Sequence, residues 1–186
     1  MFANRLTALV DACSLASALK RNLLLTLAEA GFFRLRWSSP ILDETERAIV
    51  KILHGKGRVD AAVRAKRART AMETAFEDAM VSDFDKFMSA AAGLHDPFDI
   101  HVLAAAIKTR ASMIVTENLK HFPPAKLATL DMEAKPAAEF IADTIALDEG
   151  RAVAAIRQMR ERLKKTRDHR RAATAEDGSG RDAGSG

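Results

Sequence analysis

The 186-residue chain has few of the features that indicate an exported or membrane protein. A single cysteine, Cys13, cannot form an intramolecular disulfide, which excludes a disulfide scaffold and favours a reducing compartment. No apolar run approaches the roughly 20 residues that a membrane helix needs, and the first residues lack the basic-then-apolar pattern of a signal peptide. We therefore expect a cytoplasmic protein with one well-buried core and no membrane partner.

Glycine is missing where several nucleotide-binding folds require it. The apolar run at 6–10 predicts a first strand, and the residues after it are Asp11, Ala12, Cys13 and Ser14. Without a glycine there, neither a dinucleotide-binding turn nor a P-loop can form. By resemblance to its family, a hydrolase that works through a phosphorylated aspartate would carry a second aspartate where Cys13 stands. A receiver domain would bring an extra acidic pair and a later lysine, which do not stand out.

Alternating strand and helix patterns run through most of the chain. We expect strands at 6–10, 32–37, 113–115 and 127–132, and helices at 14–30, 39–54, 59–80, 83–92 and 96–110. Such alternation predicts an α/β fold whose central, mostly parallel sheet is covered by helices on both faces.

The C-terminal third has a different composition. Pro136 precedes two further helical patterns, at 137–147 and 149–165. We therefore expect a main domain at 1–135 and a helical appendage at 136–166. The polar residues from 167 to 186 have too few apolar side chains to fold alone, so we expect a disordered tail.

Several acids stand at the predicted ends of strands and helices. Asp11 closes the first strand and Thr116 closes the third, and ligands of parallel sheets bind beyond these carboxyl ends. Glu44 and Asp99 lie in the first turns of helices that border the same edge. Clustered carboxylates repel one another unless a cation is bound, and oxygen ligands suit Mg²⁺ or Mn²⁺. The pattern predicts a metal site made by Asp11, Glu44 and Asp99.

Other candidates have ordinary structural explanations. Asp96 precedes a proline and can cap its helix, so we expect Asp96 and Ser14 to be capping or supporting residues at most. Asp43 and Glu44 point about 100° apart on a helix, so only one can face the site. A lone helical histidine such as His101 more often packs or forms hydrogen bonds than catalyses.

Two further residues of the segment at 116–123, which follows the third predicted strand, have predicted structural roles. Glu117 is expected to be a solvated loop acid, and Phe122 is expected to pack inward and close the segment after His121.

Basic residues exceed acidic ones by 29 to 25, a net charge of +4, and they cluster at 58–69 and 157–171. An acidic centre with basic flanks suits a phosphodiester substrate, although a charge run is often only a solvated helix face. We expect the first cluster to steer a phosphodiester substrate, and the candidate contacts with a nucleic acid are Arg64, Lys66, Arg67 and Arg69, together with His101.

Four segments of the chain together resemble a known family. LVDACSL, WSSPILDE, DPFDIHVLAAAI and SMIVTENLKHFP are similar, in order and rough spacing, to the four motif blocks of PIN-domain ribonucleases. The resemblance covers roughly residues 5–125 and is strongest to the VapC-type toxins of bacterial toxin–antitoxin pairs. The helices after Pro136 resemble, more loosely, the extra C-terminal segment of one subgroup. A PIN-like three-layer fold and a metal-dependent endoribonuclease are the implied fold and activity.

The resemblance also implies roles for individual residues. Asp11, Glu44 and Asp99 match the acidic metal positions, Thr116 matches a threonine that orients a carboxylate or a metal-bound water, and Asn118 falls where many members carry a fourth acid. Cys13 stands where relatives often have Asn or Ser. The implied cofactor is Mg²⁺ or Mn²⁺, and the implied partners are RNA, an antitoxin that covers the crevice and a second copy of the chain. The alternative is a catalytically weak PIN-fold module that binds RNA or protein.

Overall fold

A five-stranded parallel sheet forms the centre of the molecule in the computed structural model, which describes residues 6–94 and 96–179, with side chains described through residue 168. The strand order is β3-β2-β1-β4-β5, and every neighbouring pair is parallel. The strands are β1 (Thr7–Val10), β2 (Arg34–Ser38), β3 (Met80–Val81), β4 (Met113–Val115) and β5 (Glu133–Lys135).

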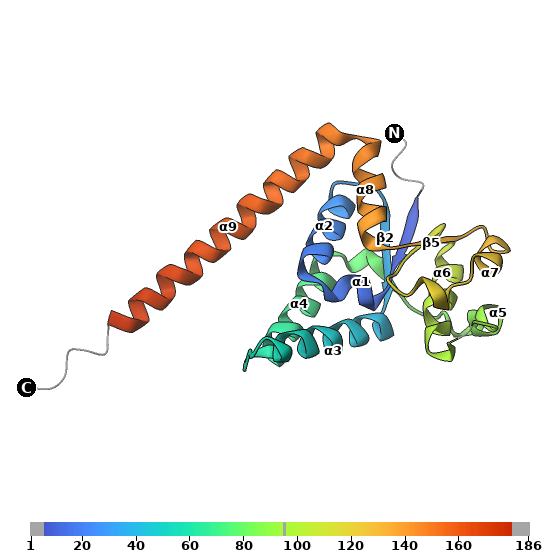
Figure 1. Ribbon diagram of the computed structural model, residues 1–186, viewed down its shortest axis with the longest axis horizontal. Coiled ribbons are helices and arrows are strands. Elements are labelled where there is room, and N and C mark those ends of the chain that lie inside the picture. The colour runs from blue at the N-terminus through green and yellow to red at the C-terminus, as the bar shows by residue number, and fades with distance from the viewer. Residues whose placement is uncertain (1–5, 95, 180–186) are drawn as a thin grey trace, which may run out of the picture.

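Helices cover both faces of this sheet and form the two outer layers (Figure 1). Helices α1 to α4 lie on one side, while α5, α6 and α7 lie on the other. The helices are α1 (Ala12–Ala16), α2 (Ala18–Glu29), α3 (Ser39–Gly55), α4 (Ala61–Ala75), α5 (Met88–Ala91), α6 (Ile100–Thr109), α7 (Pro124–Ala128), α8 (Ala137–Leu147) and α9 (Glu149–Ser179). Short 3₁₀ turns are η1 (Glu77–Ala79), η2 (Asp85–Phe87), η3 (Pro97–Asp99) and η4 (Leu119–His121). The predicted α/β, three-layer fold is confirmed.

The central strands are apolar because both of their faces are covered. Leu9, Val10, Ile114 and Val115 have no exposed surface, which is the usual condition of a parallel strand between two helical layers. In the register of β1 and β4, Val10 lies beside Val115. The residues that follow these two strands therefore emerge next to each other at the carboxyl edge of the sheet.

Several predicted helices are shorter than their sequence patterns. The pattern at 14–30 is broken at Ser17, whose backbone is extended, and Arg21 Nη1 donates to the carbonyl oxygens of Leu15 and Ala16 that end α1, at 2.6 and 3.3 Å. The pattern at 59–80 gives α4, η1 and β3, because the chain leaves the helix at Phe76. The Phe76 ring packs edge-on against Trp37, with 6.0 Å between ring centroids.

Two other element predictions need correction. Residues 83–92 form η2 and α5 rather than one helix. The strand predicted at 127–132 is wrong: Pro124 begins the helical turn α7, Asp131 adopts a left-handed backbone with φ of 54°, and β5 follows at Glu133.

The segment after Pro136 is more closely joined to the main domain than an appendage would be. Ala137, Phe140 and Ile141 of α8 belong to the same buried hydrophobic cluster as the sheet. The rings of Phe33 and Phe140 pack edge to face, with 4.9 Å between centroids.

Helix α9 also differs from expectation. It continues through Ser179, so the prediction of disorder is wrong for residues 167–179, while residues 180–186 lie outside the described residues. Residues 167–179 are rich in alanine and arginine, which favour helix without requiring burial. Among the helices of the described chain, none combines the length and the apolar character needed to cross a membrane.

Candidate metal-dependent active site

Asp11 and Thr116 form the buried centre of the site. They follow β1 and β4, and the Thr116 hydroxyl donates to Asp11 Oδ2 at 2.8 Å. Asp11 Oδ1 accepts a second hydrogen bond from the Ala12 backbone N–H at 2.7 Å. The two side chains are 3 % and 0 % exposed. The predicted meeting of these two strand ends is thus present, and the carboxylate has a fixed orientation.

Cys13 extends this hydrogen-bonded group. Its Sγ lies 3.2 Å from Asp11 Oδ2 and 3.3 Å from Thr116 Oγ1, and it accepts from the backbone N–H of Glu117 at 3.1 Å. Burial, and then the negative charge of Asp11, raise the pKa of the Cys13 thiol to about 11. The thiol therefore stays protonated at neutral pH and donates to the carboxylate rather than acting as a nucleophile.

Glu44 faces Asp11 from α3. Burial raises the pKa of Glu44, and the charge of Asp11 raises it further, while Arg47 acts in the opposite direction. Its neighbour Asp43 instead forms an ion pair with Arg69. As predicted, only one of these adjacent acids turns toward the site.

His101 lies behind Glu44, with 3.5 Å between His101 Nε2 and Glu44 Oε1. Burial lowers the pKa of His101, although the charges of Asp11 and Asp99 oppose that effect. The imidazole is thus neutral at neutral pH, and its buried Nε2 has no hydrogen-bond partner within the described chain. Since its side chain is only 13 % exposed, His101 is better placed to pack against Glu44 than to contact RNA.

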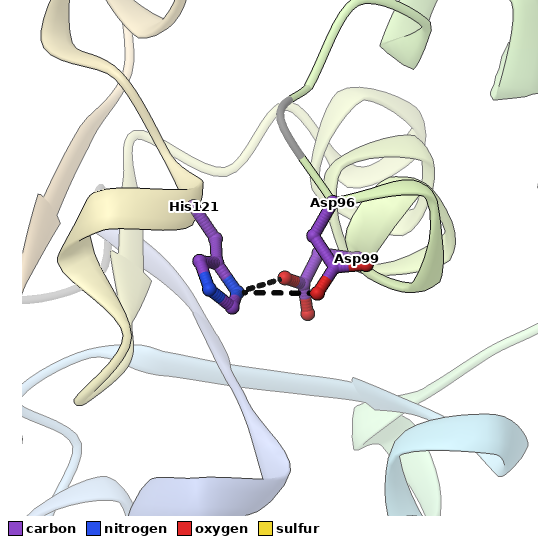
Figure 2. Close-up of side chains that lie close together, drawn as sticks. All are labelled: Asp96, Asp99 and His121. Carbon is purple, nitrogen blue, oxygen red and sulfur yellow. Dashed lines mark hydrogen bonds and ion pairs between the residues drawn. The ribbon is translucent and has the colours of Figure 1, made fainter.

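Asp99 lies in a group with Asp96 and His121 that joins η3 to η4 (Figure 2). His121 Nδ1 lies 2.6 Å from Asp99 Oδ2 and 3.7 Å from Asp96 Oδ2. One ligand atom of each residue lies within 4.8 Å of the others, and among the described residues this is the one such group of three metal-type side chains. Asp96 also accepts from the Phe98 N–H at 2.9 Å, so its predicted capping role is present.

The carboxylates of the predicted metal site influence one another electrostatically. Burial raises the pKa of Asp99, the hydrogen bond to His121 lowers it, and the charge of Asp11 raises it again. Asp99 in turn raises the pKa of Glu44. Asp11, Glu44 and Asp99 therefore face a common region. Within the described chain, however, their oxygens do not form a group as tight as that of Asp96, Asp99 and His121.

His121 is the member of the site that the sequence analysis missed. The sequence predicted only that its neighbour Phe122 would pack inward, and Phe122 is indeed 1 % exposed. The usable signal was its position five residues after Thr116, in a segment that was already expected to border the site.

Ser14 and Asn118 support the centre through backbone contacts. The Ser14 N–H donates to the Asp11 carbonyl at 3.1 Å, and its buried hydroxyl has no partner within the described residues. The Asn118 N–H donates to Thr116 Oγ1 at 3.1 Å. This bond leaves the hydroxyl proton of Thr116 directed at Asp11.

Glu117 has a structural role instead of being a freely solvated acid. Its Oε1 lies 2.9 Å from Lys20 Nζ of α2 and accepts from the Ala137 N–H, at the start of α8, at 3.2 Å.

The basic residues of α4 divide into two groups. Arg69 pairs with Asp43, Glu46 and Glu73, and so joins α4 to α3. Arg64 pairs with Asp60 at 2.5 Å. Lys66 and Arg67 form no ion pair within the described chain, and both are exposed. Arg69 is therefore the weakest of the predicted RNA contacts.

Comparisons with known proteins give the family of the chain. A family model described as "PIN domain" matches residues 7–120, and one described as "VapC50 C-terminal domain" matches residues 137–167. The chain is 47% identical over 51 residues to a Mycobacterium tuberculosis protein named "Putative ribonuclease VapC50". That alignment covers 27% of this chain and 30% of the relative, so it spans well under half of either protein. No solved structure matches. The resemblance inferred from the four sequence segments is confirmed.

Proposed function

The chain belongs to the PIN-domain family, and we propose on that premise that it is a metal-dependent endoribonuclease, the toxin of a toxin–antitoxin pair. One observation carries the proposal. Asp11, Glu44 and Asp99 lie near enough to one another that the charge of Asp11 raises the pKa values of the other two, and none of the three forms an ion pair with lysine or arginine within the described residues. Such a set of negative charges is stabilised by a divalent cation.

The donor set fits Mg²⁺ or Mn²⁺. Carboxylate oxygens of Asp11, Glu44 and Asp99 are hard ligands of the kind these ions prefer. His121 and Asp96 would add an imidazole nitrogen and a further oxygen beside Asp99, a combination that Mn²⁺ accepts more readily than Mg²⁺. When bound, such an ion lowers the pKa of a water molecule and polarises a phosphate.

The protein's own contribution is to hold the ligands in place. Thr116 fixes one oxygen of Asp11 and the Ala12 N–H fixes the other. Asn118 holds the Thr116 hydroxyl, and Cys13 donates to the same carboxylate. We assign Thr116 and Asn118 to positioning the carboxylate and the attacking water, since ligands held by such supporting bonds need little rearrangement when the ion binds.

The substrate and partners follow from the same assignment. The name of the Mycobacterium tuberculosis relative calls that protein a ribonuclease, and we extend the activity to this chain. Exposed basic side chains on α4 would steer RNA toward the carboxylates at the carboxyl edge of the sheet. An uncontrolled ribonuclease harms its host, so we propose an antitoxin that covers the site, and a homodimer as the assembled toxin.

The decisive experiment measures cleavage of RNA by the purified protein with Mg²⁺, with Mn²⁺ and with a chelator. Asp11→Asn and Asp99→Asn should each abolish cleavage, by on the order of 10³-fold, because each removes a charged metal ligand. Asp43→Asn is the matched control, since it neutralises the acid next to Glu44 that faces Arg69 instead.

Two outcomes would contradict the proposal. Cleavage that survives chelation would exclude the metal mechanism. Metal-dependent RNA binding without cleavage would support the alternative, a weak binding module in which Asn118 replaces a needed acid.

A further inference from the structure

Helix α9 is held to the domain along one side of its first half. Ala152 and Met159 are buried, and the Arg151 guanidinium lies over the Phe32 ring at 4.1 Å. Arg162 makes two hydrogen bonds to the Glu29 carboxylate of α2, at 3.2 and 2.8 Å. These contacts fix the rotation of the helix, while its second half projects away from the other elements (Figure 1).

The fixed rotation leaves four basic residues on one exposed stripe. Arg157, Arg160, Lys164 and Arg167 recur at intervals of three and four, so they lie within about 80° of one another around the helix. The stripe is centred about 120° from Met159, and all four side chains are exposed. It spans about 15 Å along the helix.

This stripe is electrostatically unsatisfied. None of its four residues forms an ion pair with any carboxylate of the described chain, in contrast to Arg162 on the packed side. Glu161 lines the same surface but forms no ion pair with the stripe among the described residues, so the row keeps a net positive charge. The natural complement of such a row is a polyanion with regularly spaced charges.

We propose that this α9 stripe binds the phosphate backbone of RNA at a distance from the active site, a role that rests on the proposed ribonuclease function. The stripe selects long or folded RNA over short strands, because only an extended substrate can reach both the acidic edge and the helix. Binding is through phosphates, without base recognition, since the four side chains form a simple row of positive charge.

An acidic protein is the competing occupant, and the composition of the stripe disfavours it. The centre of a protein interface is depleted in charged residues and rich in aromatic side chains, whereas the four positions of the α9 stripe are all charged and none is aromatic.

The test replaces the four residues together, as Arg157→Gln, Arg160→Gln, Lys164→Gln and Arg167→Gln, in the full chain. Binding is measured by fluorescence anisotropy in chelator, which prevents metal-dependent cleavage, with an RNA hairpin of about 40 nucleotides and a single strand of about six. We expect the variant to bind the hairpin at least about tenfold more weakly, and the slope of log affinity against log salt to shrink by about 3, for four lost phosphate contacts. Binding of the short strand, and its cleavage in Mn²⁺, should stay within about twofold of wild type.

Two control proteins separate charge from shape. Arg157→Lys, Arg160→Lys and Arg167→Lys keep the charge and the helix, and should keep hairpin affinity. A second variant replaces four exposed basic side chains outside α9. Its substitutions are Lys51→Gln, Lys56→Gln, Lys86→Gln and Arg110→Gln, and it should change the salt slope much less than the stripe variant does. Circular dichroism confirms that each variant is folded.

The outcomes distinguish this inference from the ribonuclease assignment. Unchanged hairpin affinity and salt slope in the four-residue Gln variant would overturn the α9 inference even if cleavage is normal. Absent cleavage by wild type, with hairpin binding that depends on the stripe, would contradict the ribonuclease and support the stripe. A four-residue Gln variant that no longer binds poly-glutamate but keeps its RNA affinity would also overturn the α9 inference, in favour of an acidic protein partner.

Discussion

Asp11 and Asp99 are carboxylates of one proposed site, yet the fold holds them differently. Asp11 is 3 % exposed and accepts hydrogen bonds from a hydroxyl, a thiol and a backbone N–H. Asp99 is only partly buried, and within the described residues its side chain is hydrogen-bonded to the imidazole of His121 (Figure 2). Asp11 therefore has three hydrogen-bond donors, whereas Asp99 has an imidazole partner whose side chain is 18 % exposed. Within the proposed site, Asp11 is the rigidly held carboxylate and Asp99 is the less constrained one.

Removing the Thr116 hydroxyl should disturb the rigidly held carboxylate, Asp11. Thr116→Val leaves the buried Asp11 carboxylate without its hydroxyl donor, so the free energy of unfolding should fall by about 2 kcal/mol. Cleavage should fall by about 10- to 100-fold, because the ligand loses its support. Denaturant unfolding and RNA cleavage measure the two effects. Thr116→Ser keeps the hydroxyl and should restore both, and a Val variant as active as wild type would remove Thr116 from the mechanism.

Replacing His121 should change metal affinity at the less constrained carboxylate, Asp99. His121→Gln removes an imidazole, so Mn²⁺ should bind about tenfold more weakly while Mg²⁺ changes by less than about threefold. Isothermal titration calorimetry gives both affinities. His101→Gln is the matched control, because it removes the other imidazole of the region, behind Glu44. Equal losses for both ions in the His121 variant would show a general structural effect instead.

The pH dependence of stability should reflect the partly buried acids. Folding raises the pKa values of Glu44 and Asp99, so the metal-free folded protein binds protons that the unfolded chain releases. Their stabilising contribution is present below the ordinary carboxyl pKa of about 4 and is lost as pH rises through the higher folded values. Metal should therefore raise the melting temperature more at pH 7 than at pH 4.

A double variant provides the control for that measurement. Glu44→Gln with Asp99→Asn removes both titrations, so the metal-free protein should lose this decline in melting temperature between pH 4 and pH 7. A wild-type protein that gains the same metal stabilisation at both pH values would contradict the electrostatic account.

The smallest effect is expected at Cys13. Because its pKa is raised to about 11, iodoacetamide at pH 7 should modify it at least about 100-fold more slowly than a free thiol. Cys13→Ser should alter cleavage by less than about threefold, since a hydroxyl can donate to Asp11 in the same way. Mass spectrometry follows the labelling, and rapid modification would show that the thiol is more accessible or more acidic than described.

The sequence was most informative where local pattern and burial agree. Apolar runs at 6–10 and 113–115 predicted the two central strands, and their parallel pairing brought Asp11 beside Thr116. The strand predicted at 127–132 failed because an apolar run followed by charged residues does not reveal the left-handed turn at Asp131. The pairing of Arg69 with Asp43 was also invisible, since it depends on how α3 and α4 pack. His121 reaches Asp99 across 22 positions of the chain, a contact that no local spacing encodes.

Glu117 has a consequence for how the chain can be divided. Its carboxylate, one residue after Thr116, receives Lys20 from α2 and the first N–H of α8. Cutting the protein before residue 137 would remove a contact of the loop that follows Thr116 and would expose the Phe33 ring. The carboxyl-terminal helices therefore hold the segment after β4 in place, and a protein truncated before residue 137 is expected to lose order in that segment first.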